Sequence, residues 1–284
     1  MTLLVFGSTG QVASELRRHA PEARFLGRNE ADLTDPPACA NAVRTMAPSA
    51  VINAAAYTAV DRAEDEEAQA EIVNADSPAA IARACAALNV PLVQISTDYV
   101  FDGSGRAPWR PGDPVAPQNA YGRSKSRGEN GVRAAGGPFA ILRTSWVFSF
   151  HGANFVKTML RLGESRDSLN IVDDQVGGPT PAEDIALACL QIARQLVLDP
   201  AKSGIYHFSG APDTSWKAFA QMIFVHAGLP VTVTGIPTSD YPTPARRPLN
   251  SRLDCSETET VFGLHRPDWQ SGLTRVLQDL KEGS

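Results

Sequence analysis

The first twenty residues constrain the fold more than any other stretch of this 284-residue chain. Residues 2–6 form a continuous apolar run, Gly7 and Gly10 follow it, and an amphipathic segment covers residues 11–19. This order is typical of a strand, a glycine turn and a helix. In such a unit the glycines let the backbone approach a pyrophosphate, and a small residue, here Ala13, lets the helix pack closely on the strand. The helix N-terminus attracts phosphate, so we predict a dinucleotide site, with a plain turn as the alternative.

Strands and helices alternate up to residue 148. We expect strands at residues 2–6, 23–26, 50–53, 91–95 and 138–143, with helices at 11–19, 36–46, 68–88 (interrupted near Pro78) and 119–134. Such alternation predicts an α/β fold with a Rossmann-type, doubly wound parallel sheet whose strands all end at one ligand-binding edge.

The pattern changes after residue 148. A helix is expected at 154–163, a strand at 168–172, and a helix that runs to about residue 197; the strand at 204–208 should rejoin the main sheet. We therefore predict an NADPH-binding domain of residues 1–150 and 179–210, and a smaller C-terminal substrate-binding lobe of residues 151–178 and 211–284.

Charge and cysteine content narrow the class of protein. With 26 basic and 31 acidic residues the net charge is −5, which argues against charge-driven binding of nucleic acid or membrane surfaces. The four cysteines are widely spaced, so neither a disulfide framework nor a zinc site is indicated. We expect no signal peptide or membrane span and a cytoplasmic protein with reduced thiols. The acidic run at residues 64–67 is interpreted as a solvated helix face.

Two segments at the predicted sheet edge suit a dinucleotide. Arg28 follows the second strand, where an arginine accommodates the 2′-phosphate of NADP, so NADPH is favoured and NADH remains possible. The alternative is a solvated arginine. Shortly after it, Asp32 and Leu33 are placed to flank the adenine. The alanines at residues 54–56 leave room for a flat ligand at the end of the third strand, although tight packing alone would also explain them.

A candidate acid lies on the helix at 119–134. Tyr121 and Lys125 are four residues apart and share one helical face, so an ammonium group can lie near a phenol. A nearby cation favours the phenolate and lowers the pKa of the phenol. Thr97, at the end of the fourth strand, could hydrogen-bond the oxygen that the tyrosine protonates. The spacing alone is weak, because it occurs by chance in many helical proteins.

Nine segments together resemble one family. They are residues 4–12, 53–61, 96–101, 121–125, 143–147, 154–160, 174–180, 241–245 and 251–253. In this order they resemble the dTDP-4-dehydrorhamnose reductase family, which belongs to the extended short-chain dehydrogenase/reductases. The resemblance implies a role in dTDP-rhamnose and cell-surface polysaccharide biosynthesis.

The resemblance also implies residue roles. The catalytic set is Thr97, Tyr121 and Lys125. With Arg28, the cofactor set is Gly7, Thr9, Gly10, Gln11, Val12, Asp32, Leu33, Ala54, Ala55, Ala56, Tyr121 and Lys125. The substrate set is Thr58, Val60, Thr97, Asp98, Tyr99 and Trp146. A nicotinamide would deliver hydride to carbon 4 of a dTDP-ketosugar while Tyr121 protonates its oxygen. Thr97 would stabilise the developing charge, and Lys125 would hold the nicotinamide ribose and lower the pKa of Tyr121.

Two further groups carry weaker expectations. Arg246 and Arg247 suit the diphosphate of the nucleotide sugar, or are merely solvated. Some family members carry magnesium at a homodimer contact, and Glu15, Glu183 and Asp184 could match that site. Solvated helical carboxylates are the favoured interpretation of these three residues.

Two other functions compete with the reductase. A nucleotide-sugar epimerase or dehydratase would share the fold, but a dehydratase usually has an Asp-Glu pair after the threonine, and here Tyr99 follows Asp98. A non-catalytic dinucleotide-binding subunit, such as the regulatory subunit of methionine adenosyltransferase, is the third possibility. The intact set Thr97, Tyr121 and Lys125 argues against it.

Overall fold

A six-stranded parallel sheet forms the centre of the molecule in the computed structural model, which describes residues 1–282. Its strand order is β10-β5-β4-β3-β1-β2, and every neighbouring pair is parallel. The strands are β1 (Leu3–Phe6), β2 (Arg24–Leu26), β3 (Ala50–Asn53), β4 (Leu92–Thr97), β5 (Phe139–Thr144) and β10 (Gly204–His207). The predicted doubly wound parallel fold is confirmed, and β10 rejoins the sheet beside β5 as expected.

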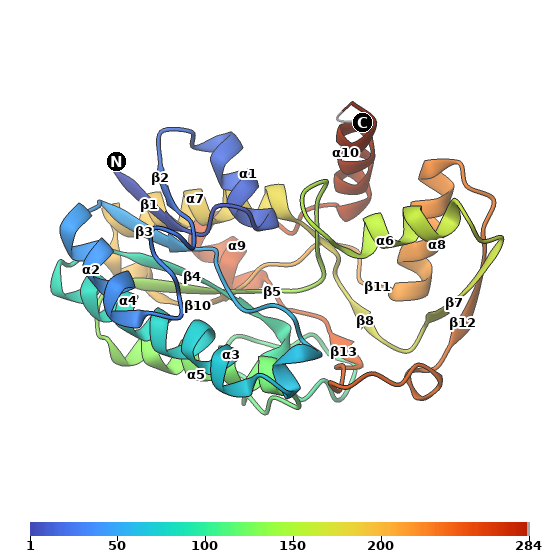
Figure 1. Ribbon diagram of the computed structural model, residues 1–284, viewed down its shortest axis with the longest axis horizontal. Coiled ribbons are helices and arrows are strands. Elements are labelled where there is room, and N and C mark those ends of the chain that lie inside the picture. Colours follow the sequence, from blue (N-terminus) through green and yellow to red (C-terminus); the bar gives the residue numbers. More distant parts are fainter. Residues whose placement is uncertain (283–284) are drawn as a thin grey trace.

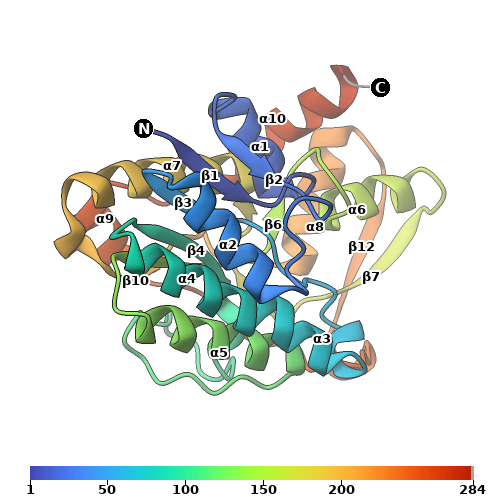
Figure 2. The same ribbon diagram turned by 60° about the vertical axis from the view of Figure 1, so that its left-hand side comes forward.

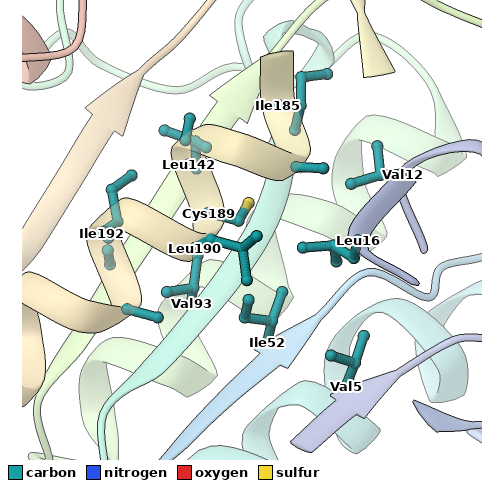
Figure 3. Close-up of a cluster of buried hydrophobic side chains, with 14 of the residues drawn as sticks. Val5, Val12, Leu16, Ile52, Val93, Leu142, Ile185, Cys189, Leu190 and Ile192 are labelled. Atoms are coloured by element: carbon teal, nitrogen blue, oxygen red, sulfur yellow. The ribbon is translucent and has the colours of Figure 1, made fainter. Parts of the chain in front are cut away.

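Helices cover both faces of this sheet, which explains why its strands are continuous apolar runs. Side chains of β1 alternate: Leu3 and Val5 join one buried cluster, and Leu4 and Phe6 join the other. The first cluster lies under α1 (Gln11–His19) and α7 (Ala182–Leu198). Figure 3 shows its strand residues beneath Ile185 of α7.

The opposite face is covered by α2 (Pro36–Met46), α4 (Ser77–Ala87) and α5 (Ala120–Ala134), which pack beside one another (Figure 2). The segment predicted as one interrupted helix is divided further. It comprises α3 (Glu67–Glu71), a π-helical stretch (Ile72–Asp76) and α4. The π-helical stretch contacts α5.

A second lobe lies beyond the end of the sheet (Figure 1). It contains α6 (Phe155–Gly163), α8 (Trp216–Ala227), α10 (Trp269–Glu282) and the parallel pair β7 (Ser168–Val172) and β12 (Thr232–Ile236). Its own core gathers Phe219, Phe224, Trp269 and Leu273.

One helix of the predicted C-terminal lobe packs elsewhere. Helix α9 (Ser256–Phe262) contacts α7 and β10, and Phe262 belongs to the buried cluster under α7. By its packing α9 therefore belongs with the central sheet, because its apolar face is buried there and not against α6 or α8.

Short strands connect the two lobes. Strand β6 (Val147–Phe148) pairs with β9 (Thr180–Pro181), and β8 (Val176–Gly177) pairs with β11 (Thr214–Ser215) and β13 (Asn250–Ser251). These pairings hold the segments after β5 at the carboxyl edge of the sheet. Between residues 1 and 282, every helix is too short or too polar to cross a bilayer.

Candidate active site

A cavity of about 650 Å³ opens at the carboxyl edge of the sheet. The chain leaves β1 in one direction and returns to its other side in β3, so the strand order reverses at β1. Ligands of doubly wound sheets bind at this kind of switch point. The cavity lies there, lined by Gly7 after β1 and by residues 54–56 after β3.

The glycine turn leaves room for a ligand against bare backbone. Gly7 has a φ of +107°, a conformation that L side chains rarely adopt, and a Cβ there would lie 3.3 Å from the Ala54 carbonyl carbon. Gly10 is the N-cap of α1 and supplies no side-chain cap, so the first turn offers its amide groups to an anion. The predicted residues Thr9, Gln11 and Val12 also line the cavity.

The residues predicted at the adenosine end lie in the same cavity. Arg28 is exposed there and forms no hydrogen bond or ion pair within residues 1–282. Its guanidinium group is therefore free to meet an anion. The Asp32 carboxylate accepts the Thr34 N–H at 2.9 Å, and Leu33 lies beside it in the cavity wall.

Helix α5 is fixed at its start by two side chains. Asn119 Oδ1 accepts the Gly122 N–H at 2.7 Å, and Glu64 Oε1 accepts the Ala120 N–H at 2.7 Å. Residues 64–67 are less solvated than expected, because Glu64 holds the start of α5 and Glu67, although 38% exposed, pairs with Arg123 at 2.8 Å. These carboxylates lie near the N-terminus of α5, where negative charge is favoured.

A close approach places Tyr121 in the cavity. The Cβ of any residue at position 122 would lie only 2.2 Å from the Tyr99 carbonyl oxygen, so only glycine lets α5 come this near to the end of β4. The rings of Tyr99 and Tyr121 then meet edge to face, with centroids 5.6 Å apart. Both line the cavity, together with Lys125 and Thr97.

The electrostatics of the pair differ from the sequence-based expectation. Burial raises the pKa of Tyr121 to about 12, and the neighbouring Thr97 hydroxyl only partly offsets this. The expected lowering by Lys125 is not found. Burial lowers the pKa of Lys125 itself to about 8, while Glu129 opposes that change, and its Nζ donates to the Ile95 carbonyl oxygen at 2.7 Å. The phenol is consequently protonated at neutral pH.

The hydroxyl of Thr97 has two partners. It donates to Asp98 Oδ1 at 3.1 Å and accepts the Tyr99 N–H at 3.2 Å. Burial raises the pKa of Asp98 to about 6, so this carboxylate is largely ionised at neutral pH and holds the threonine proton.

The sugar side of the cavity contains the remaining predicted residues and one that sequence reasoning missed. Thr58, Val60, Asp98, Tyr99 and Trp146 all line it. The missed residue is Trp216, whose ring is stacked on Trp146. Its position as the first residue of a helix gave no sign of this contact.

The arginine pair is placed differently from the prediction. Neither Arg246 nor Arg247 is among the residues that line the cavity. Arg247 Nη2 donates to Asp61 Oδ2 at 2.6 Å, and Arg246 is exposed beside Gln118. The fold brings Asp61 to Arg247 across a large distance in sequence, while Arg247 Nη1 is buried without a hydrogen-bond partner within residues 1–282. The diphosphate role of this pair stays a prediction.

Comparison with known proteins identifies the family. The model of the RmlD substrate binding domain matches residues 1–282. A dTDP-4-dehydrorhamnose reductase from Sinorhizobium fredii is 44% identical over 98% of this chain and 97% of its own length. The chain belongs to the dTDP-4-dehydrorhamnose reductase family.

Solved structures agree with this assignment. A dTDP-4-dehydrorhamnose reductase from Clostridium acetobutylicum superposes with a TM-score of 0.91, at 36% identity, over 99% of this chain and 100% of its own. A dTDP-4-dehydrorhamnose reductase from Bacillus anthracis, in complex with NADP, has a TM-score of 0.90 at 33% identity, covering 98% and 100% of the two chains.

The favoured interpretation of Glu15, Glu183 and Asp184 as solvated carboxylates is wrong, because Glu15 is buried and the other two are half-buried against Arg275. The alternative, a magnesium site, does not fit them either. Ligand atoms of Glu15, His19 and Glu183 lie within 4.8 Å of one another. However, Arg275 donates to Glu183 at 3.1 Å and to Asp184 at 2.9 Å. Glu15 is likewise paired with a neighbouring arginine. Since these guanidinium groups already compensate the carboxylates, the residues do not fit a divalent cation, and the comparisons give magnesium no support.

Proposed function

We propose that this chain catalyses the NADPH-dependent reduction of dTDP-4-dehydro-6-deoxy-L-mannose (dTDP-4-dehydro-L-rhamnose) to dTDP-L-rhamnose. One observation carries the proposal: Thr97, Tyr121 and Lys125 meet the glycine turn in a single cavity. Two relatives that match almost the full chain, from Sinorhizobium fredii and Escherichia coli, are dTDP-4-dehydrorhamnose reductases.

The cavity fits a nicotinamide dinucleotide. Gly7 leaves bare backbone beside Ala54, the first turn of α1 has no side-chain cap, and Arg28 has an unpaired guanidinium group at the second strand. We assign the pyrophosphate to the turn at residues 7–12, and the adenosine end to Arg28, Asp32 and Leu33. When bound, the reduced cofactor supplies the hydrogen and the electron pair that the ketone carbon gains.

Tyr121 acts as the general acid in this proposal. Because burial raises the pKa of its phenol to about 12, the proton is present at neutral pH and is available to the substrate oxygen as negative charge develops there. Thr97 positions that oxygen by a hydrogen bond, for which its hydroxyl proton turns from Asp98 Oδ1 to the substrate oxygen when the ketosugar binds. Lys125, held by the Ile95 carbonyl oxygen, orients the ribose and keeps positive charge near the phenolate left behind.

The competing functions are less compatible with the cavity. A dehydratase needs a further acid and base to expel water. The residue after Asp98 is Tyr99 and not a carboxylic acid, and burial raises the pKa of this tyrosine above its usual value. A non-catalytic subunit needs neither a protonated phenol nor a buried lysine in its cavity, and the cavity of this chain holds both.

Turnover of the nucleotide sugar tests the proposal. The purified chain should oxidise NADPH when mixed with dTDP-4-dehydro-L-rhamnose, followed by the loss of absorbance of the reduced nicotinamide. Tyr121→Phe should lower kcat by roughly 10²- to 10⁴-fold, which is the usual contribution of a general acid. The matched control is Tyr206→Phe, since Tyr206 is buried in β10 and donates to the Lys202 carbonyl oxygen away from the cavity. An unchanged rate in Tyr121→Phe would remove this tyrosine from the mechanism.

Cofactor preference is tested at Arg28. A charged hydrogen bond to the 2′-phosphate contributes about 1.5–3 kcal/mol, or roughly 10- to 100-fold in affinity. Arg28→Ala should therefore raise the KM for NADPH by that factor and leave the KM for NADH unchanged. Equal changes for both cofactors would contradict the assignment.

The remaining expectations concern the organisation of the protein. We infer that residues 1–150 and 179–210 bind the cofactor and that 151–178 and 211–284, apart from α9, bind the sugar nucleotide. We also infer a cytoplasmic enzyme that acts on a dTDP-sugar, binds neither nucleic acid nor membrane, and forms a homodimer. Light scattering of the purified chain measures the last point, and a monomeric mass would contradict it.

A further inference from the structure

Within residues 1–282, Trp216 is the one cavity-lining residue that lies after Ala153. Trp216 opens α8, a helix whose other buried residues belong to the core of the second lobe. Among the described residues of this lobe, which also places Gly152 and Ala153 in the cavity wall, Trp216 supplies the one large side chain.

The ring of Trp216 lies directly on Trp146. Their centroids are 3.6 Å apart and the ring planes deviate by 11°. Because Trp216 covers this face of the Trp146 ring, a sugar cannot pack on it. Trp216 therefore limits which part of Trp146 a ligand in the cavity can contact. Behind Trp146 there is little space for rearrangement: a Cβ on Gly177 would approach its ring to 3.0 Å.

The backbone of Trp146 supports the same conclusion. Its φ is +50°, an unusual conformation for a bulky residue, which costs about 1–3 kcal/mol and persists only where the surroundings enforce it. The stack with Trp216 and the close contact with Gly177 both restrict the Trp146 side chain.

Contacts other than the stack on Trp146 also hold Trp216 in place. Its Nε1–H donates to Gln175 Oε1 at 3.1 Å, and Gln175 Nε2 donates in turn to Thr238 Oγ1 at 3.1 Å. The ring of Phe155 packs against the ring of Trp216, with the two centroids 4.5 Å apart and the ring planes inclined by 50°. Ser215 caps α8 by accepting the Ala218 N–H at 3.2 Å, which fixes where the helix begins.

We propose that Trp216 is a specificity-determining and positioning residue of the sugar pocket, which holds Trp146 in register and completes a two-ring apolar wall for the deoxyhexose. The proposal rests on the reductase function proposed above. Aromatic rings suit the apolar face and the methyl group of a 6-deoxysugar, because these parts offer no hydrogen bond that the wall would leave unmet.

Steady-state kinetics of Trp216→Leu test the proposal, with the KM for the dTDP-ketosugar, the KM for NADPH and kcat measured separately. A stacked aromatic pair contributes about 2- to 12-fold to an equilibrium constant. We expect the sugar KM to rise by roughly 10-fold, the NADPH KM to stay within about 2-fold, and Trp216→Phe to restore most of the sugar affinity. The matched control is Trp269→Phe, since Trp269 lies in the core of the same lobe and outside the cavity.

A second variant avoids dependence on the folding of Trp216→Leu. Gln175→Met removes the acceptor of the indole N–H and should raise the sugar KM by roughly 2- to 5-fold without changing the NADPH KM. An unchanged sugar KM in both variants, or equal rises in the two KM values, would overturn the proposal. The wild-type chain separates the two hypotheses: its failure to turn over the ketosugar sinks the proposed function, whereas turnover with unaffected variants sinks only the role of Trp216.

Discussion

Glu129→Gln should be among the most destabilising single substitutions in the chain. Glu129 and Arg143 form a buried bidentate pair, at 2.9 Å through Nε and 2.6 Å through Nη2, with side chains only 4% and 2% exposed. Ser96 Oγ also donates to Glu129, at 2.6 Å. Glutamine keeps one acceptor but removes the charge, which leaves the guanidinium buried without a counterion. Breaking a buried pair in this way costs about 3–5 kcal/mol, a large part of a typical folding stability of about 5–15 kcal/mol.

Urea denaturation at pH 7, followed by circular dichroism, measures this loss. The control is Glu67→Gln, which breaks the Glu67–Arg123 pair on the outer side of α5, where both side chains are 38% exposed. An exposed pair contributes only about 0.2–1 kcal/mol. If the two variants lose the same free energy of unfolding, or if Glu129→Gln loses less than about 1 kcal/mol, the reasoning from burial is wrong.

The double variant Glu129→Met/Arg143→Met sharpens the test. Replacing a buried pair by apolar side chains of similar volume is often neutral, because both desolvation penalties disappear together. We expect the double variant to be more stable than Glu129→Gln, although the Pro111 carbonyl oxygen and Ser96 lose a partner. A double variant that is less stable than the single one would show that the network's hydrogen bonds outweigh the stranded charge.

Two further predictions concern the same helix. Burial lowers the pKa of Lys125 to about 8 from 10.5. Its ammonium group therefore loses its proton as pH rises through about 8, and kcat should decline above that pH. Because Glu129 raises the pKa of Lys125, Glu129→Gln should move this decline to lower pH. Between pH 8 and 10.5 the unfolded chain binds more protons at Lys125 than the folded chain does, so this lysine makes the folding stability rise with pH. Urea midpoints at several pH values measure this rise. Gly122→Ala, whose Cβ would lie 2.2 Å from the Tyr99 carbonyl oxygen, should cost about 1–3 kcal/mol and lower kcat by displacing Tyr121; a normal kcat and urea midpoint would show that α5 shifts freely.

The sequence predicts the cavity well where residues follow a strand directly. Gly7, Arg28 and Ala54 come just after strands of a parallel sheet, and Thr97 ends another. The carboxyl ends of such strands meet at one edge. Local order along the chain then decides position in space, and no knowledge of distant packing is needed. To place Tyr121 and Lys125, only the helical repeat is needed in addition, because it puts residues four apart on one face of a helix.

The failures have a different physical origin. Asp61 neutralises Arg247 and Trp216 covers Trp146, and both contacts join segments that are far apart in sequence. Such contacts depend on how the second lobe meets the sheet, about which spacing carries no information. The pKa of Tyr121 was predicted in the wrong direction for a related reason, because a four-residue spacing reports the nearness of Lys125 but not the burial that dominates.

The two faces of the sheet differ in the kind of residues that they bury. The face under α7 holds a large apolar cluster, in which Ile185, Ile192 and Leu196 belong to the same buried group as the strand residues. The face under α5 buries Lys125, Glu129 and Arg143. Polar groups at such positions cost free energy unless they are paired. Glu129 and Arg143 pair with each other, and Lys125 lines the cavity together with Thr97 and Tyr121. Large-to-small changes under α7, such as Ile192→Val, should therefore lower stability by about 0.5–1.5 kcal/mol while the pH dependence of kcat stays fixed, whereas changes under α5 should move both.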